Sequence, residues 1–415
     1  MARHPTRGDL NISRDFLRKI PKTDLHVHLD GSLRIYTLID LAKEYKVRLP
    51  SYTEEGLRKL VFTGNYKNLS EYLKGFQYTT QVLQTREALE RAAYELAMDE
   101  FGDGVRYLEV RFAPQLHINE KLSFEDIMIA VNNGLNRAKR AINSLPQIRN
   151  GAEPPFEYGI IGCAMRKFSE DFSDYYRQFI KVHKFLDDEE RFALASMELV
   201  RGLVRVRDEY GIPVVGFDLA GEEYGYPAED HREAFIYAHK NFMKKTVHAG
   251  EAFGAESIFQ AITDLYADRI GHGTHLFDAD MVDLPTRKER VRYVEELAQY
   301  IADRRITIEV CLTSNTETDP NLRDVTKHPC RKMLEKNLSV TFCTDNMLIS
   351  NTTVSRELEI AVNTFGLDLK RLKDIIVYGF KRSFFPQKYT EKRKYVRSVI
   401  NFYESLESSV SLPTK

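Results

Sequence analysis

Three histidines and one aspartate in this chain are spaced so that they could bind a metal ion. His26 and His28 lie two residues apart in a segment that favours a strand, where alternate side chains share a face. His248 and Asp345 lie at the ends of two other short apolar segments. Imidazole nitrogens and a carboxylate are typical zinc ligands, with a water molecule completing the coordination. We therefore expect these four side chains to hold one Zn²⁺ per chain.

Glu251 and His272 could supply the proton transfers that hydrolysis at such a metal requires. Zinc lowers the pKa of a coordinated water to about 7. His272, between Gly271 and Gly273, would orient this water or accept its proton. Glu251, three residues after His248, would be the proton donor and shuttle, because a carboxyl group in a closed pocket can have a raised pKa. The six residues together predict a hydrolytic metal site.

Each of these residues has a simpler interpretation when it is taken alone. A single histidine is more often a surface or hydrogen-bonded core residue than a metal ligand. Asp345 would then cap the helix expected near Thr352–Ser355, and Glu251 would lie in the first turn of the following helix. The metal-site prediction depends on all six residues together. They fall at the same end of separate predicted strands, which is improbable by chance.

Short apolar segments alternate with longer helical patterns, which indicates parallel βαβ units. Eight such units favour an α/β fold of the (β/α)₈ TIM barrel type, whose active sites lie at the carboxyl ends of the strands. A doubly wound open sheet is the alternative, but it gives no point at which the first, fifth, sixth and eighth strands meet. The expected strands are Thr23–Val27, Val105–Phe112, Tyr158–Cys163, Val214–Leu219, Thr246–Ala249, Arg269–Gly271, Thr307–Val310 and Ser339–Cys343.

We expect one metal-dependent hydrolase domain over residues 1–415. A helical insertion at about 52–84 includes the amphipathic segment Leu69–Tyr78, and would either cover the barrel mouth as a lid or pack on the side of the barrel. Extra C-terminal helices, at about 366–415, would follow the last strand. Among the connecting helices, the pattern predicts one continuous helix over Thr326–Lys336.

Composition limits the partners and the compartment. The chain is 43% hydrophobic and 29% charged with a net charge of −1, so no strong field favours nucleic acid or an anionic membrane surface. No run of 18 apolar residues predicts a transmembrane helix, and Met1–Asp9 lack the apolar core of a signal peptide. The four cysteines are scattered, which is typical of free thiols in a reducing compartment. We expect a cytoplasmic protein, and its oligomeric state stays open.

Six ordered segments resemble the adenosine deaminase family, the zinc aminohydrolase branch of the amidohydrolase barrels. The resemblance covers most of the chain and is specific, because all six motifs occur in order. It implies a (β/α)₈ fold and hydrolytic deamination of a purine nucleoside, adenosine or 2′-deoxyadenosine, to inosine or 2′-deoxyinosine plus ammonia. The segments are Asp24–Ser32, Asp218–Glu223, Val247–Glu251, Arg269–Gly273, Val310–Asn315 and Thr344–Asp345.

The resemblance also implies roles for individual residues. It agrees with the ligand set given above, and it makes Glu251 the residue that protonates purine N1. Gly221 would donate its backbone N–H to purine N3, and Asp30 would bind the ribose 5′-hydroxyl. Leu73 and Phe76 would belong to an apolar gate helix.

The segment after the eighth strand departs from the family pattern. The family usually has Asp-Asp-Pro where this chain has Asp345, Asn346 and Met347. The second aspartate normally contacts purine N7, for which it must carry a proton. The amide of Asn346 can donate without one, but the pocket loses a carboxylate, which we expect to alter substrate preference. This chain is therefore similar to a divergent subgroup of the family.

Other functions stay open at this point. A related deaminase would act on another 6-amino or N6-substituted purine nucleoside or nucleotide, or on a 5′-modified adenosine, although Asp30 would repel a 5′-phosphate. A two-metal ester or amide hydrolase commonly uses a bridging carboxylated lysine on the fourth strand, and Val214–Leu219 has no lysine. A nucleoside-binding protein without turnover would have no need for both Glu251 and His272.

Overall fold

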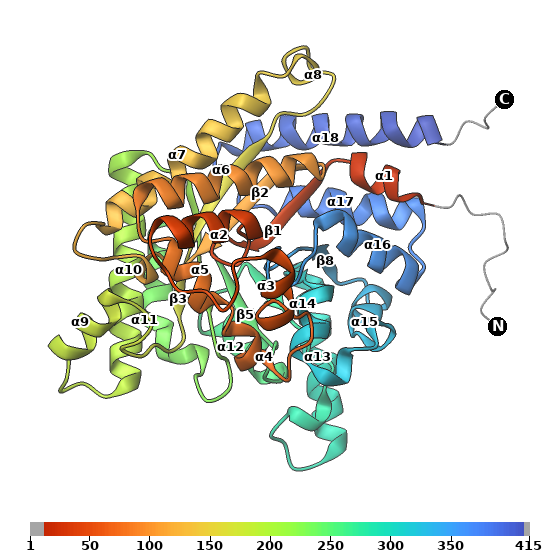
Figure 1. Cartoon of the computed structure of the whole chain (residues 1–415). Coiled ribbons are helices and arrows are strands. Elements are labelled where there is room, and N and C mark those ends of the chain that lie inside the picture. The colour runs from red at the N-terminus through yellow and green to blue at the C-terminus, as the bar shows by residue number, and fades with distance from the viewer. Residues whose placement is uncertain (1–11, 411–415) are drawn as a thin grey trace.

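Eight parallel strands wind into a barrel surrounded by helices in the computed structural model, which describes residues 12–410 (Figure 1). Each strand pairs in parallel with the next one along the chain. Nearly every strand residue is buried, as expected where helices cover the outside and side chains fill the inside. The strands are β1 (Lys22–His28), β2 (Val105–Phe112), β3 (Glu157–Met165), β4 (Val214–Ala220), β5 (Lys244–Ala249), β6 (Arg269–His272), β7 (Thr307–Val310) and β8 (Ser339–Phe342).

The barrel closes between β8 and β1 through the chain that follows β8. Val27 and Asp345 form an isolated parallel bridge. The backbone N–H of His28 donates to the Asp345 carbonyl, and the N–H of Asp345 donates to the His26 carbonyl, both at 2.8 Å. The (β/α)₈ prediction is therefore confirmed, and the open-sheet alternative is wrong. The closing contact also brings three of the predicted metal ligands together.

Several long helices around the barrel begin at side chains that cap them. Ser123, Asp187 and Thr286 each form a capping box with the residue three positions later, at the starts of α7, α10 and α13. The helices are α1 (Arg14–Lys19), α2 (Ile35–Glu44), α3 (Glu54–Leu60), α4 (Leu69–Leu73), α5 (Phe76–Val82), α6 (Arg86–Gly102), α7 (Phe124–Asn143), α8 (Pro146–Arg149), α9 (Asp174–Val182), α10 (Asp188–Tyr210), α11 (Arg232–Lys240), α12 (Ala255–Thr263), α13 (Arg287–Arg304), α14 (Leu312–Thr318), α15 (Cys330–Glu335), α16 (Val354–Phe365), α17 (Leu369–Arg382) and α18 (Tyr389–Val410). Short 3₁₀ turns lie at η1 (Pro114–Leu116), η2 (Ala228–His231), η3 (Ala279–Met281), η4 (Pro320–Leu322) and η5 (Val325–Lys327).

Two predicted helices are interrupted. The continuous helix over Thr326–Lys336 is wrong, because Pro329 separates the 3₁₀ turn η5 from α15. Proline lacks a backbone N–H and clashes with the preceding turn, so it is excluded from a helix interior. The segment Leu69–Tyr78 forms two short helices, α4 and α5, with Lys74 and Gly75 between them.

The C-terminal helices cover the end of the barrel opposite the site. The N–H of Phe384, after α17, donates to Glu109 Oε1 (2.5 Å), and the Phe384 ring lies 3.5 Å from the Arg269 guanidinium. The Tyr395 hydroxyl of α18 donates to the Arg106 carbonyl (2.6 Å) at the start of β2. Among the described helices, none combines the length and the apolar composition needed to cross a bilayer. Met1–Asp9 and both ends of the predicted 1–415 domain lie outside the described residues.

Candidate metal centre and active site

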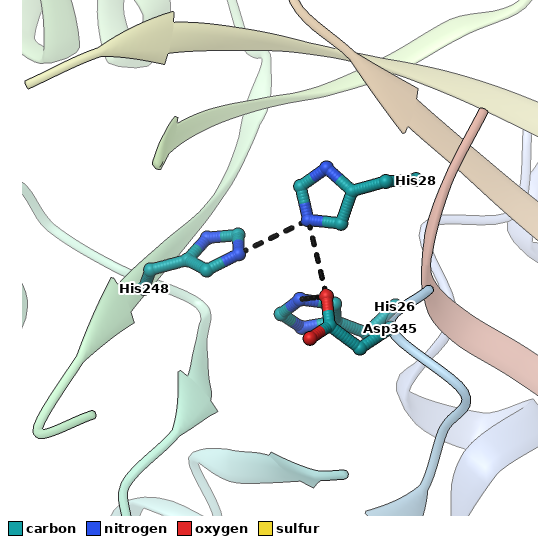
Figure 2. Close-up of side chains that lie close together, drawn as sticks. All are labelled: His26, His28, His248 and Asp345. Atoms are coloured by element: carbon teal, nitrogen blue, oxygen red, sulfur yellow. Dashed lines mark hydrogen bonds and ion pairs between the residues drawn. The ribbon is translucent and has the colours of Figure 1, made fainter. Parts of the chain in front are cut away.

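Four side chains converge at one point inside the mouth of the barrel, and Figure 2 shows them turned toward one another. His26 and His28 come from β1, His248 from β5, and Asp345 from the loop after β8. One ligand atom of each lies within 4.8 Å of the others. Nε2 of His28 is 3.2 Å from Nε2 of His248, and Asp345 Oδ1 is 3.5 Å from Nε2 of both β1 histidines. The structure thus brings the whole predicted ligand set together.

Buried carboxylates behind two of these histidines fix their orientation. Nδ1 of His26 is 2.8 Å from Glu309 Oε2, and Nδ1 of His248 is 3.1 Å from Asp218 Oδ2. Arg111 pairs with both carboxylates, at 2.9 Å from Asp218 and 2.8 Å from Glu309. A carboxylate that accepts the Nδ1–H turns the Nε2 lone pair away from itself. Both imidazoles therefore present Nε2 to the centre of the cluster.

The charges of the cluster fit a divalent cation. Nε2 of His26 is buried and has no hydrogen-bond partner within the described part of the chain. Burial lowers the pKa of His28 and of His248, so both rings are neutral near pH 7. Burial opposes ionisation of Asp345, but the imidazoles beside it, with His26 Nε2 at 3.5 Å, hold its pKa below the usual range. The neutral rings of His28 and His248 beside a buried carboxylate form a site that a cation stabilises.

Glu251 and His272 lie directly beside the four-residue cluster. The His272 ring centroid is 4.8 Å from that of His26, and Glu251 Oε1 is 3.7 Å from His272 Nε2. The side-chain amide of Asn315 contacts His272 Nδ1 at 3.0 Å, which leaves Nε2 facing Glu251. Burial raises the pKa of Glu251 well above its usual value and lowers that of His272 well below its own. Burial therefore favours the protonated carboxyl group of Glu251 and the neutral ring of His272.

One buried carboxylate, that of Glu223 after β4, holds the loop that carries Glu251. Its two oxygens accept five hydrogen bonds, so the backbone of this loop has one well-determined position. The sequence motif Asp218–Glu223 contains this residue, but its role was missed because the contact joins two loops. The donors are the backbone N–H groups of Gly250 (2.7 Å), Glu251 (3.0 Å), Ala252 (2.7 Å) and Phe253 (2.9 Å), and the hydroxyl of Ser257.

Two site residues have a backbone conformation that residues other than glycine rarely adopt. His272 and Asp345 have φ angles of 65° and 60°, in the left-handed region. Such strain persists where surrounding structure enforces it, and it is enriched at functional sites. Gly271 is constrained by space, because a Cβ at this position would lie 2.9 Å from Cε1 of His26. The His26 ring, which lies against the Gly271 backbone, therefore requires glycine at this position.

A cavity of about 410 Å³ opens beside His28 and contains most of the predicted substrate contacts. Asp30, Gly221, Leu73 and Phe76 all line it. The Phe76 ring meets the His28 ring edge to face, with 6.3 Å between centroids. Leu73 ends α4 and Phe76 begins α5, so both of these short helices border the cavity. A larger hollow between α9 and α10 contains none of the predicted site residues.

Asn346 and Asp30 each carry a buried oxygen, Oδ1, without a hydrogen-bond partner among the described residues. Burial raises the pKa of Asp30 to about 7. Nε2 of His117 lies 4.0 Å from Asp30 Oδ2, and its Nδ1 contacts the Leu83 carbonyl at 2.9 Å. Asn346 does not line the cavity, and its amide nitrogen donates to the Tyr72 hydroxyl at 2.9 Å. Sequence reasoning missed His117 and Tyr72, since neither belongs to a motif.

Comparison with known proteins assigns the family. The family model described as adenosine deaminase matches residues 21–401. An adenosine deaminase from Mycobacterium marinum is 36% identical over 372 residues, which are 89% of this chain and 92% of that protein. A probable adenosine deaminase from Dictyostelium discoideum is 32% identical over 397 residues, 95% of this chain, and the chain spans 44% of that protein's length. The structure of an N6-mAMP deaminase from Arabidopsis has a TM-score of 0.71 at 23% identity, covering 93% of this chain and 99% of that chain. The protein therefore belongs to the adenosine deaminase family, and it is a deaminase-type hydrolase that acts on C–N bonds.

Proposed function

We propose that this protein catalyses the zinc-dependent hydrolytic deamination of adenosine or 2′-deoxyadenosine to inosine or 2′-deoxyinosine plus ammonia. One observation carries the proposal. The cluster of His26, His28, His248 and Asp345 lies beside a protonated acid and a neutral base, at the end of a cavity of nucleoside size, in a chain of the adenosine deaminase family.

We propose that the four-residue cluster holds one zinc ion per chain. Three imidazoles and one carboxylate are a donor set that zinc accepts, and the carboxylates behind His26 and His248 fix the rings for it. When bound, zinc acts as a Lewis acid that activates water for attack at neutral pH. The fourth strand, Val214–Ala220, carries no lysine to bridge a second metal, which favours a single ion.

Glu251 and His272 perform the proton transfers in this proposal. Glu251 is protonated because burial raises its pKa, so it can donate to purine N1 and make C6 electrophilic. Neutral His272 can accept the proton of the attacking water through Nε2 when its ring proton lies on Nδ1, which requires the Asn315 amide to turn its oxygen toward that nitrogen. The proton held by His272 then moves to the amino nitrogen, the C6–N bond breaks and ammonia leaves. The proton of the new C6 hydroxyl returns to Glu251, which gives the 6-oxo product and restores both residues. Glu223 holds the Glu251 backbone, and Asn315 holds the His272 ring, throughout these steps.

The cavity supplies contacts for the rest of the nucleoside. Gly221, whose φ of 101° suits glycine, would donate its N–H to purine N3. Asp30 would accept a hydrogen bond from the ribose 5′-hydroxyl. Leu73 and Phe76 would cover the base, so that the segment at about 52–84 acts as the lid of a single barrel domain. Asn346 does not line the cavity, but it follows the Asp345 ligand and would contact purine N7 of a base that reaches the metal.

A substrate panel tests the proposal and separates the alternatives. Purified zinc-loaded protein is incubated with adenosine, 2′-deoxyadenosine, AMP, N6-methyl-AMP and 5′-modified adenosines, and ultraviolet spectra and ammonia release are measured. We expect the highest kcat/KM for adenosine or 2′-deoxyadenosine above pH 7, because Asp30 is ionised above its raised pKa of about 7 and then repels a 5′-phosphate. If the protein prefers a nucleotide, its substrate is a purine nucleotide and not adenosine or 2′-deoxyadenosine. Absence of any spectral change and of any released amine, which is methylamine for N6-methyl-AMP and ammonia for compounds with a free 6-amino group, would contradict the deaminase assignment.

A further inference from the structure

A chain of buried polar groups connects the lid to the residue beside the Asp345 ligand. The amide nitrogen of Asn346 donates to the Tyr72 hydroxyl at 2.9 Å, and this hydroxyl is 2.9 Å from Ser350 Oγ. All three side chains are buried, with exposed fractions of 2%, 1% and 2%. Tyr72 belongs to α4 of the lid, whereas Asn346 and Ser350 follow β8. The lid and the metal loop therefore share one hydrogen-bond network.

The outer end of this network has an unpaired atom. Oδ1 of Asn346 is buried without a partner among the described residues. It fills the space beside Gly31, where a Cβ would lie only 1.7 Å away from it. A buried carbonyl oxygen without a hydrogen bond costs about 1–3 kcal/mol. In this orientation the amide oxygen therefore lacks the hydrogen bond that its burial requires.

The direction of the network is reversible. A half-turn of the Asn346 amide exchanges its oxygen and nitrogen with almost no change of shape. Each hydroxyl can donate or accept, so Ser350 can donate to Tyr72, and Tyr72 can then donate to Asn346 Oδ1. In that arrangement the amide N–H₂ occupies the position beside Gly31. The side chain would then present a donor where it now presents an acceptor.

We propose that Tyr72 is the positioning residue that sets the Asn346 amide to donate a hydrogen bond to purine N7. This inference rests on the proposed function. In a purine, C6 and N7 are both attached to C5, so a group next to a metal ligand that faces C6 is placed near N7. N7 is an acceptor only, and it therefore selects the amide orientation in which Tyr72 holds Oδ1.

The test compares adenosine with 7-deazaadenosine, in which a C–H group replaces N7. Intrinsic reactivity differs between the two compounds, so the informative quantity is the change of their kcat/KM ratio on mutation. Tyr72→Phe keeps the buried ring and removes only the hydroxyl. We expect it to lower kcat/KM for adenosine about tenfold and to leave that for 7-deazaadenosine nearly unchanged.

Tyr66→Phe is the matched control. Tyr66 is buried against Tyr72, with 5.1 Å between ring centroids, but its hydroxyl contacts the Val61 carbonyl at 3.4 Å and not Asn346. We expect no change of the substrate ratio in this variant. An equal loss for both substrates in Tyr72→Phe, no loss for either, or the same ratio change in Tyr66→Phe would overturn the proposal.

A binding measurement separates this inference from the proposed function. The affinities of the products inosine and 7-deazainosine are measured by calorimetry for the wild type and both variants. We expect Tyr72→Phe to remove most of the preference for inosine. If the wild type fails to deaminate adenosine, the proposed function fails while the binding ratio still tests the role of Tyr72. An inosine preference that survives in Tyr72→Phe contradicts that role.

Discussion

The site has two halves, which differ in how their polar atoms are paired. The metal half holds the four-residue cluster, and the substrate half holds the cavity and Asn346. On the metal side, Glu309 and Asp218 hold the outer nitrogens of His26 and His248. On the substrate side, Asp30 and Asn346 each have a buried oxygen without a partner among the described residues. The chain itself therefore preorganises the metal half.

The difference follows from what each half must bind. A metal ion requires fixed lone pairs, and carboxylates behind the histidines provide them. A substrate brings its own donors and acceptors, which complete the groups that the protein leaves unpaired. Each unmet buried group costs about 1–3 kcal/mol before binding, and a substrate with matching groups relieves that cost. The unpaired oxygens of Asp30 and Asn346 are therefore available to a substrate.

The largest expected effect comes from Glu251, which lies where the two halves meet. Glu251→Gln keeps the shape of the side chain but removes the acidic proton, so we expect kcat to fall by about 10²–10⁴-fold. Zinc content and the melting temperature should stay close to those of the wild type, because Glu223 still holds the loop. Steady-state kinetics and metal analysis measure both. Activity like that of the wild type would remove Glu251 from the mechanism.

The pH profile sharpens the same assignment. A proton donor works only while it is protonated, and burial raises the pKa of Glu251 well above its usual value. Activity should therefore persist through neutral pH and decrease as the pH rises through that raised pKa, by about tenfold per unit well beyond it. The dependence of kcat on pH from acid to alkaline values measures this. A profile that instead rises steadily with pH contradicts an acid role.

Removing a carboxylate that holds a ligand histidine should lower the affinity for zinc without unfolding the protein. Asp218→Asn removes the charge behind His248, and we expect zinc affinity to fall by about 10–100-fold. Competition with a zinc chelator measures it. Asp268→Asn is the control. Asp268 lies directly before β6, pairs with Lys245 of β5 and contacts none of the four ligands. Equal affinity in both variants would show that the Asp218 contact does not support the metal.

A change in the substrate half should have the smallest effect and a different signature. Asn346→Asp introduces a group that donates to purine N7 only when it is protonated. We expect substrate ranking to shift by about tenfold or less, with zinc content unchanged. The substrate panel applied to wild type and variant measures the shift. An unchanged ranking would place Asn346 outside the pocket.

The sequence predicted the barrel because each strand is short, apolar and followed by a helix. Val105–Phe112 and Thr307–Val310 match their predicted bounds, and the other strands differ from theirs by few residues. The helix over Thr326–Lys336 failed because its apolar period masked the effect of Pro329. The local sequence pattern was thus sufficient to predict which segments are strands or helices. It was less reliable for predicting where a helix is interrupted.

The site divides in a similar way. The six predicted metal and proton-transfer residues converge because a barrel brings strand ends to one mouth. The partners that hold them were harder to predict. The contact of Tyr72 with Asn346 spans 274 positions, and the contact of Glu223 with Glu251 joins two loops. Such contacts depend on tertiary packing, which no local spacing encodes.

The most direct test of the account locates the metal. Crystals of the zinc-loaded protein are measured at the zinc absorption edge, and an anomalous difference map is calculated. We predict one peak, about 2.0–2.2 Å from Nε2 of His26, His28 and His248 and from Oδ1 of Asp345. No peak at that position, or a second metal peak beside it, would contradict the single-zinc centre.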